Sequence, residues 1–176
     1  MTATPTSALN TDLRISSDSH MAEPFDLWEK GLPKKYSDHR LRYPDREYGS
    51  HQHAREGGWL PGPRLKDMAL DRVAAEVLYP TLGLKLFGLD DADVQERAMR
   101  QFNDWLIDYC QADTSRLVGV ATISGYNIEH AVAELERCKA EGLRGFLLWQ
   151  ATHPDMPFTS ERYDPLWAAA QELEMP

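Results

Sequence analysis

The sequence predicts an α/β fold made of parallel βα units. Apolar, strand-like segments alternate with amphipathic, helix-like segments along most of the 176 residues, which is typical of parallel strands joined by right-handed helical crossovers. The strand segments are almost continuously apolar, and this favours a sheet that is covered on both faces. Four such units indicate either a small, open doubly wound sheet or the amino-terminal half of a TIM-type (β/α)8 barrel.

The first expected strand, residues 13–17, runs directly into Asp18-Ser19-His20. Side chains two residues apart in a strand point to the same side, so Asp18 and His20 should project together. They do so at the carboxyl end of a strand, where α/β proteins place their chemistry. A carboxylate oxygen beside an imidazole nitrogen makes half of a divalent-metal site. The same spacing also fits an Asp that caps a turn and a His bonded to it, because a single Asp-x-His motif is weak.

A long aromatic and proline-containing loop, residues 25–63, follows this strand. It is too long for an ordinary connection and too aromatic for a disordered linker. Beyond it, helices are expected at 64–72, from Asp90 or Asp91 to Tyr109, from the Asn127 cap to the closing Gly142, and from the Asp164 cap onward. Strands are expected at 75–80, 117–124 and 143–149.

The charge balance limits the kinds of partner. The chain carries 28 acidic and 19 basic residues, a formal net charge of −9, without the basic cluster that phosphate binding requires. No apolar run reaches the length of a membrane span, and residues 1–12 lack the features of a signal peptide and should form a flexible tail. We therefore expect a cytoplasmic protein that acts on a small molecule and not on nucleic acid or a membrane, with Cys110 and Cys138 as buried free thiols.

The segment Ile15-Ser-Ser-Asp-Ser-His-Met-Ala-Glu-Pro24, with Leu27-Trp28, resembles the opening of the amidohydrolase-related metal-dependent hydrolases. That family includes the aminocarboxymuconate-semialdehyde and resorcylate decarboxylases. Later segments resemble the same family in the same order, so that the likeness extends from about Leu13 to Pro176. They are residues 64–68 with 75–81, 102–105, 116–119, and 143–145 with 163–170.

The resemblance implies a (β/α)8 barrel that holds one divalent ion at the carboxyl ends of its strands. The ion is expected to be zinc, with manganese or magnesium as alternatives, and the family's first-strand ligands fall on Asp18 and His20. The family's fifth-strand His and eighth-strand Asp, which also serves as base, have no counterpart within these residues. The resemblance therefore implies the amino-terminal half of the barrel in residues 13–176, and no catalytic base is assigned.

Three further residues are candidates for the substrate pocket. Tyr79 and Trp149 lie near strand ends, where they line a pocket or simply pack in the core or at its rim. Glu23 is either a partner that orients His20 or a loop carboxylate.

The resemblance implies the amino-terminal half of a metal-dependent hydrolase or non-oxidative decarboxylase that acts on a small carboxylated or cyclic organic substrate, and we expect a homo-oligomer. The residues themselves independently supply the parallel α/β order and the pair Asp18 and His20. The alternative is a non-catalytic half-barrel that associates with itself or with a complementary half, because its first and last strands would otherwise be unpaired edges. A doubly wound domain for a phosphorylated ligand is disfavoured, because the sequence has no glycine-rich phosphate loop.

Overall fold

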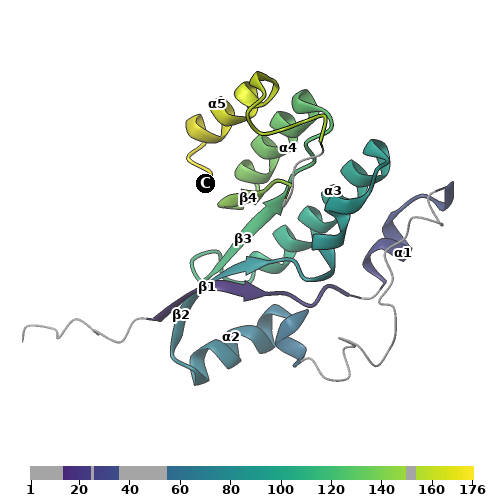
Figure 1. Cartoon of the computed structure of the whole chain (residues 1–176). Helices are drawn as coiled ribbons and strands as arrows, with labels where there is room; N and C mark the ends of the chain where they lie inside the picture. The colour runs from purple at the N-terminus through teal and green to yellow at the C-terminus, as the bar shows by residue number, and fades with distance from the viewer. Residues whose placement is uncertain (1–13, 25, 36–54, 150–153) are drawn as a thin grey trace, which may run out of the picture.

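The computed structural model of the chain describes residues 14–24, 26–35, 55–149 and 154–176. Its centre is a four-stranded sheet in which the strands follow one another in chain order and all neighbours are parallel (Figure 1). The strands are β1 (Arg14–His20), β2 (Val73–Tyr79), β3 (Leu117–Thr122) and β4 (Gly145–Leu147). This arrangement confirms the predicted parallel βα class. The expected tail, residues 1–12, and residues 36–54 of the expected loop lie outside the described residues.

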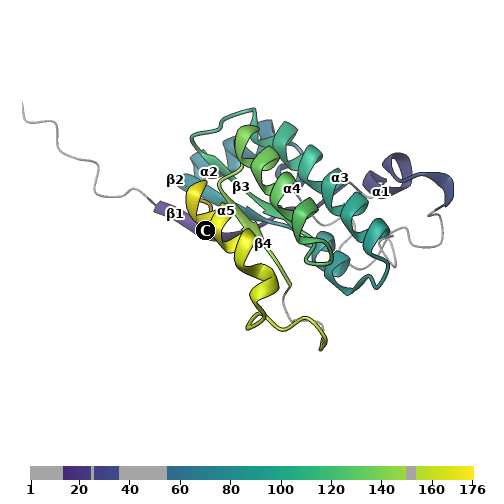
Figure 2. The same cartoon turned by 90° about the horizontal axis from the view of Figure 1, so that it is seen from above.

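The helices alternate with the strands, and α3 and α4 lie side by side along the sheet (Figure 2). The α-helices are α1 (Leu27–Gly31), α2 (Pro61–Leu70), α3 (Ala92–Cys110), α4 (Ile128–Ala140) and α5 (Asp164–Glu172); the short 3-10 helices are η2 (Glu56–Gly58), η3 (Leu82–Gly88) and η4 (Glu161–Tyr163). None of the described helices has the length and apolar composition of a membrane span.

Local signals in the sequence set the ends of α3 and α4. The side chain of Asp91 accepts a hydrogen bond from the Val94 backbone N–H at 3.1 Å, and that of Asn127 accepts one from His130 N–H at 3.1 Å. Both are N-cap interactions of the expected kind. Gly142 follows α4 with a φ of +100°, a left-handed conformation that glycine adopts without a Cβ clash.

Several predicted boundaries were wrong: β2 begins at Val73 and not at residue 75, β3 ends at Thr122 and not at residue 124, and β4 covers only residues 145–147 of the expected 143–149. Three further differences have a clear local reason. β1 continues through His20 instead of stopping at residue 17, because β2 offers pairing partners as far as Tyr79. α2 begins at Pro61 and not at residue 64, since the fixed φ of proline suits the first helical turn. Asp164 is the first residue of α5 and not its cap, because η4 already brings Tyr163 to helical backbone angles.

The core is a single cluster between the sheet and the helices, built around Leu78, Phe102, Leu106, Leu117 and Leu135. A cavity of about 370 Å³ borders the sheet and is lined by residues of every strand: Ser17, Val77, Tyr79, Val118, Val120, Gly145 and Leu147 are among them. Tyr79 therefore faces this cavity, while its neighbour in sequence, Leu78, is fully buried in the core.

The two cysteines are buried and free, as predicted. Burial raises the pKa of the Cys110 thiol to about 12 and also raises that of Cys138.

Candidate metal and substrate site

Asp18 and His20 meet at the carboxyl end of β1. Oδ1 of Asp18 lies 3.5 Å from Nε2 of His20, and the two side chains are 80% and 47% exposed. β1 carries an irregularity that includes Asp18: Ser16 pairs with Glu76 but Ser19 pairs with Leu78, so that β1 holds one residue more than β2 over this span. Such β-bulges redirect side chains and are common beside functional sites.

The imidazole of His20 is oriented by the backbone of the next strand. Nδ1 lies 2.8 Å from the carbonyl oxygen of Pro80. A carbonyl oxygen can only accept a hydrogen bond, so Nδ1 carries the proton and donates it. In the neutral form of the imidazole, Nε2 then has the lone pair, and it faces the Asp18 carboxylate. A metal-binding histidine commonly has this arrangement, with its second nitrogen bound to a backbone carbonyl.

The pair fits a divalent ion. Metal–nitrogen and metal–oxygen bonds of about 2.1 Å place two ligands of a tetrahedral ion about 3.4 Å apart, and the observed separation of Asp18 Oδ1 and His20 Nε2 is 3.5 Å. Asp18 and His20 are thus the residues that could hold an ion. In the part of the chain that the structure describes, no third His, Cys, Asp or Glu joins a pair to form a metal-binding cluster.

Glu23 is fully buried and holds the chain segment that follows β2. Its Oε1 accepts hydrogen bonds from the backbone N–H groups of Thr81 and Gly83 at 2.9 and 2.8 Å, and its Oε2 accepts one from Leu82 at 3.0 Å. Burial raises the pKa of the Glu23 carboxyl, and hydrogen bonds from the backbone N–H groups of residues 81–83 and of Glu23 itself oppose that shift. The segment bound by Glu23 begins directly after Pro80, which binds His20.

The two aromatic candidates lie at the carboxyl ends of different strands of the sheet. The ring of Tyr79 is 6.2 Å from that of His20, centroid to centroid, so Asp18, His20 and Tyr79 come together at the ends of β1 and β2. Trp149 follows β4, is 7% exposed, and packs at right angles to Tyr126 with centroids 4.8 Å apart. Its indole N–H is buried without a hydrogen-bond partner among the described residues.

Sequence reasoning missed Arg64 as a neighbour of this site. Nε of Arg64 lies 2.5 Å from Oε2 of Glu76, and Nη1 donates to the backbone carbonyl of His20 at 3.3 Å. One signal in the sequence could have pointed to it. Glu76 is a charge inside an otherwise apolar strand, and a buried charge requires a partner.

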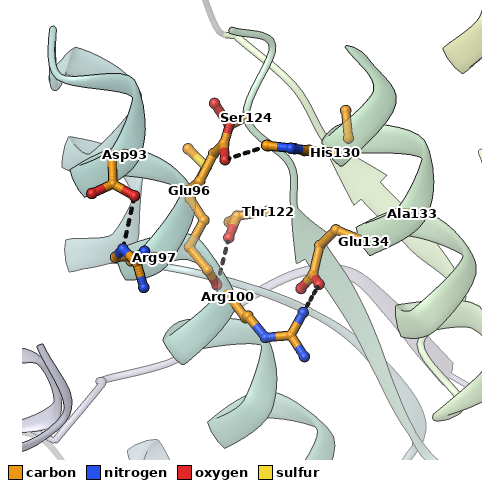
Figure 3. A pocket seen from close by; sticks show the side chains of 11 residues that line it. Asp93, Glu96, Arg97, Arg100, Thr122, Ser124, His130, Ala133 and Glu134 are labelled. Atoms are coloured by element: carbon orange, nitrogen blue, oxygen red, sulfur yellow. Dashed lines mark hydrogen bonds and ion pairs between the residues drawn. The ribbon is translucent and has the colours of Figure 1, made fainter. Parts of the chain in front are cut away.

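A second histidine–carboxylate pair lies in a cleft of about 420 Å³ between α3 and α4, shown in Figure 3. Nδ1 of His130 is 2.9 Å from Oε2 of Glu96, and Arg100 pairs with Glu134 at 2.9 Å. Here the histidine uses Nδ1 for the carboxylate, whereas His20 uses Nδ1 for a carbonyl and turns Nε2 toward Asp18. His130 is therefore a useful comparison for His20.

The geometry can be compared with known proteins. A sequence model of the family described as "Amidohydrolase" matches residues 48–176. No curated protein matches the sequence. Among solved structures, the chain is similar to an amidohydrolase from Mycobacterium avium subsp. paratuberculosis K-10, with 19% identity and a TM-score of 0.78, over 96% of this chain and 57% of that one.

Two decarboxylases have the same fold. The 2,6-dihydroxybenzoate decarboxylase from Rhizobium is 20% identical with a TM-score of 0.62, over 93% of this chain and 48% of that one. The 5-carboxyvanillate decarboxylase from Novosphingobium aromaticivorans DSM 12444, complexed with manganese and 4-hydroxy-3-methoxy-5-nitrobenzoic acid, is 21% identical with a TM-score of 0.66, over 93% of this chain and 49% of that one. The chain spans about half the length of these structures, and its fold is that of the amino-terminal half of a TIM barrel, as predicted.

Proposed function

The chain belongs to the amidohydrolase family, and on this basis we propose that Asp18 and His20 bind a divalent metal ion of a hydrolase or non-oxidative decarboxylase. The observation that carries the proposal is the 3.5 Å separation of Asp18 Oδ1 and His20 Nε2 at the carboxyl end of the first strand. That position is where barrel enzymes assemble their active sites. The family match does not favour the alternative of a non-catalytic half-barrel.

In this proposal each residue has a separate task. His20 presents the lone pair of Nε2 while its Nδ1–H donates a hydrogen bond to the Pro80 carbonyl oxygen, and Asp18 supplies a negatively charged oxygen. A bound ion would polarise a substrate carbonyl or carboxylate and lower the pKa of a bound water. Catalytic sites usually offer at least three protein ligands, so we propose that turnover requires ligands in addition to this pair.

The proposed substrate is a small carboxylated or cyclic organic compound. Two similar structures are decarboxylases of 2,6-dihydroxybenzoate and 5-carboxyvanillate, and this supports an aromatic carboxylate as the first class to test. Tyr79, beside His20, and Trp149, after β4, are the proposed aromatic walls of the pocket. For the ion, zinc, manganese and magnesium remain the candidates, and manganese is the practical probe because it is paramagnetic.

The proposal can be tested by adding Mn²⁺ to the isotope-labelled 176-residue chain and following paramagnetic broadening of its NMR signals. Broadening should be strongest at Asp18 and His20, and His20→Ala should abolish it there. His130→Ala is the matched control, because it removes the histidine of the other pair and should leave the broadening at Asp18 unchanged. If His20→Ala retained the wild-type broadening at Asp18, the metal assignment would be wrong. If Mn²⁺ broadened no signal near β1, the non-catalytic alternative would gain support.

A further inference from the structure

The segment that leaves β2 is held from two sides, by the last residue of β1 and by a residue that follows β1. His20 Nδ1 donates to the Pro80 carbonyl at 2.8 Å. Three residues further along the chain, Glu23 accepts hydrogen bonds from three successive backbone N–H groups, those of residues 81–83. The peptide that joins Pro80 to Thr81 therefore has its carbonyl bound by His20 and its N–H bound by Glu23.

A carboxylate suits this place better than its amide analogue. Both oxygens of Glu23 are acceptors, and the backbone N–H groups of residues 81–83 that face them are donors. A glutamine could place its oxygen where Oε1 now accepts from Thr81 and Gly83, but its NH₂ would then face the Leu82 N–H, donor against donor. The approach is also close: a Cβ added to Gly83 would lie 3.1 Å from Glu23 Oε1 and 2.8 Å from the Pro80 Cβ.

The orientation of the His20 imidazole depends on the Pro80 carbonyl. Its side chain is 47% exposed, so packing alone does not fix the imidazole. The hydrogen bond to the Pro80 carbonyl is the contact that sets the ring orientation and retains the proton on Nδ1. A free imidazole exchanges between its two neutral tautomers, and the bond made by one nitrogen decides which form the other presents.

We propose that Glu23 is a positioning residue for His20. By binding the backbone N–H groups of Thr81, Leu82 and Gly83, Glu23 fixes the Pro80 carbonyl, and the carbonyl in turn keeps His20 in the Nδ1–H form with Nε2 directed at Asp18. The inference deepens the proposed function, because Nε2 is the atom that would bind the ion. It can nevertheless be tested without any ion.

The first test is the tautomer of His20 in the isotope-labelled chain, read from long-range ¹H–¹⁵N correlations at about pH 8, where imidazoles are neutral. The wild type should show the Nδ1–H form, and Glu23→Gln should shift His20 toward a mixture with the Nε2–H form. Glu134→Gln is the matched control, since it makes the same carboxylate-to-amide change on α4, where the partners are Arg100, Asn103 and Arg137. The control should leave the His20 tautomer unchanged.

A purely structural role for Glu23 predicts a different result. In that case both Gln variants would lower the melting temperature while His20 stayed in the Nδ1–H form, and this outcome would overturn the proposal. If Glu23→Gln fails to fold, Glu23→Asp replaces it. Aspartate keeps the charge but is one methylene too short to reach all three N–H groups, so a partial tautomer shift is expected and an unchanged tautomer again refutes the proposal.

The second test is the affinity for Mn²⁺. Loss of a group that orients a metal-binding histidine typically weakens binding about 10- to 100-fold, so Glu23→Gln should need correspondingly more Mn²⁺ for equal broadening at Asp18, and Glu134→Gln should not. The two proposals can fail separately. If the wild type binds no Mn²⁺ but Glu23→Gln still shifts the tautomer, the metal site is refuted and the positioning role of Glu23 stands.

Discussion

Arg64 of α2 and Glu76 of β2 form a largely buried ion pair, with Nε 2.5 Å from Oε2 and side chains that are 14% and 12% exposed. The same guanidinium donates to the backbone carbonyl of His20. One arginine therefore neutralises the charge within the apolar strand β2 and also ties the end of β1 to the helix that covers it. The stability of this part of the sheet should depend on Arg64.

Replacing Arg64 by methionine should lower the free energy of unfolding by about 3 to 5 kcal/mol, because Glu76 would remain as a buried carboxylate without its cation. Adding Glu76→Leu should recover most of that loss, since replacing a whole buried ion pair by apolar residues is often neutral. Urea unfolding of the single and double variants measures both effects.

Arg97→Met is the control for this series. It breaks the ion pair between Arg97 and Asp93, whose side chains are 52% and 51% exposed, respectively. This change should alter the free energy of unfolding by about 0.5 kcal/mol or less. An Arg64→Met protein that unfolded at the wild-type urea concentration would contradict the role given to the buried pair.

The parts of the fold that the sequence predicts well are those with local signals. Asp91, Asn127 and Gly142 mark helix ends through bonds and backbone angles within a few residues of themselves. The 3-10 helix η3, Leu82–Gly88, was not predicted, because its support comes from distant residues. Glu23 binds its first N–H groups, and Gln95 donates from Nε2 to the Leu86 carbonyl at 2.9 Å.

The candidate site likewise has one feature that a local sequence pattern predicts and others that depend on distant contacts. The two-residue period of a strand was enough to place Asp18 and His20 together. It could not indicate the extra residue in β1, because a bulge depends on how two strands pair. Nor could it indicate the role of Pro80, because that role belongs to a backbone carbonyl, which every residue possesses.

Glu134 should make the stability of the protein depend on pH. Burial alone would raise the pKa of its carboxyl, but the hydrogen bonds from Arg137 and Asn103 and the charges of Arg137 and Arg100 outweigh it and hold the pKa below the ordinary value of 4.5. A lowered pKa in the folded state means that the unfolded chain takes up the proton first as the pH falls. The stabilisation by Glu134 is therefore complete well above pH 4.5 and is lost as the pH falls through the folded-state pKa.

Glu134→Gln should accordingly cost about 1.5 to 3 kcal/mol at pH 7, as expected for hydrogen bonds to a charged group, and the cost should shrink as the pH is lowered below 4.5. Urea unfolding at a series of pH values measures the difference. Glu136→Gln, an exposed position on the same helix, should give a small difference at every pH. An equal cost of Glu134→Gln at pH 7 and pH 3 would show that its ionised form is not what stabilises the fold.

The contact between Gly125 and Trp149 leads to a prediction about the loop that follows β3. A Cβ added to Gly125 would overlap Nε1 of the Trp149 indole and lie 2.7 Å from its Cε2. Gly125→Ala should therefore displace the indole and lower the free energy of unfolding by about 1 to 3 kcal/mol, the usual cost of overpacking. The indole N–H signal of Trp149, assigned by comparison with Trp149→Phe, should move.

Gly88→Ala is the control, because nothing lies within 4 Å of a Cβ at that position. It should leave the Trp149 signal in place and change stability by about 0.5 kcal/mol or less. If Gly125→Ala left both the signal and the stability as in the wild type, the indole would not be fixed by that glycine. The orientation of Trp149, and with it its proposed place in the pocket wall, would then require another explanation.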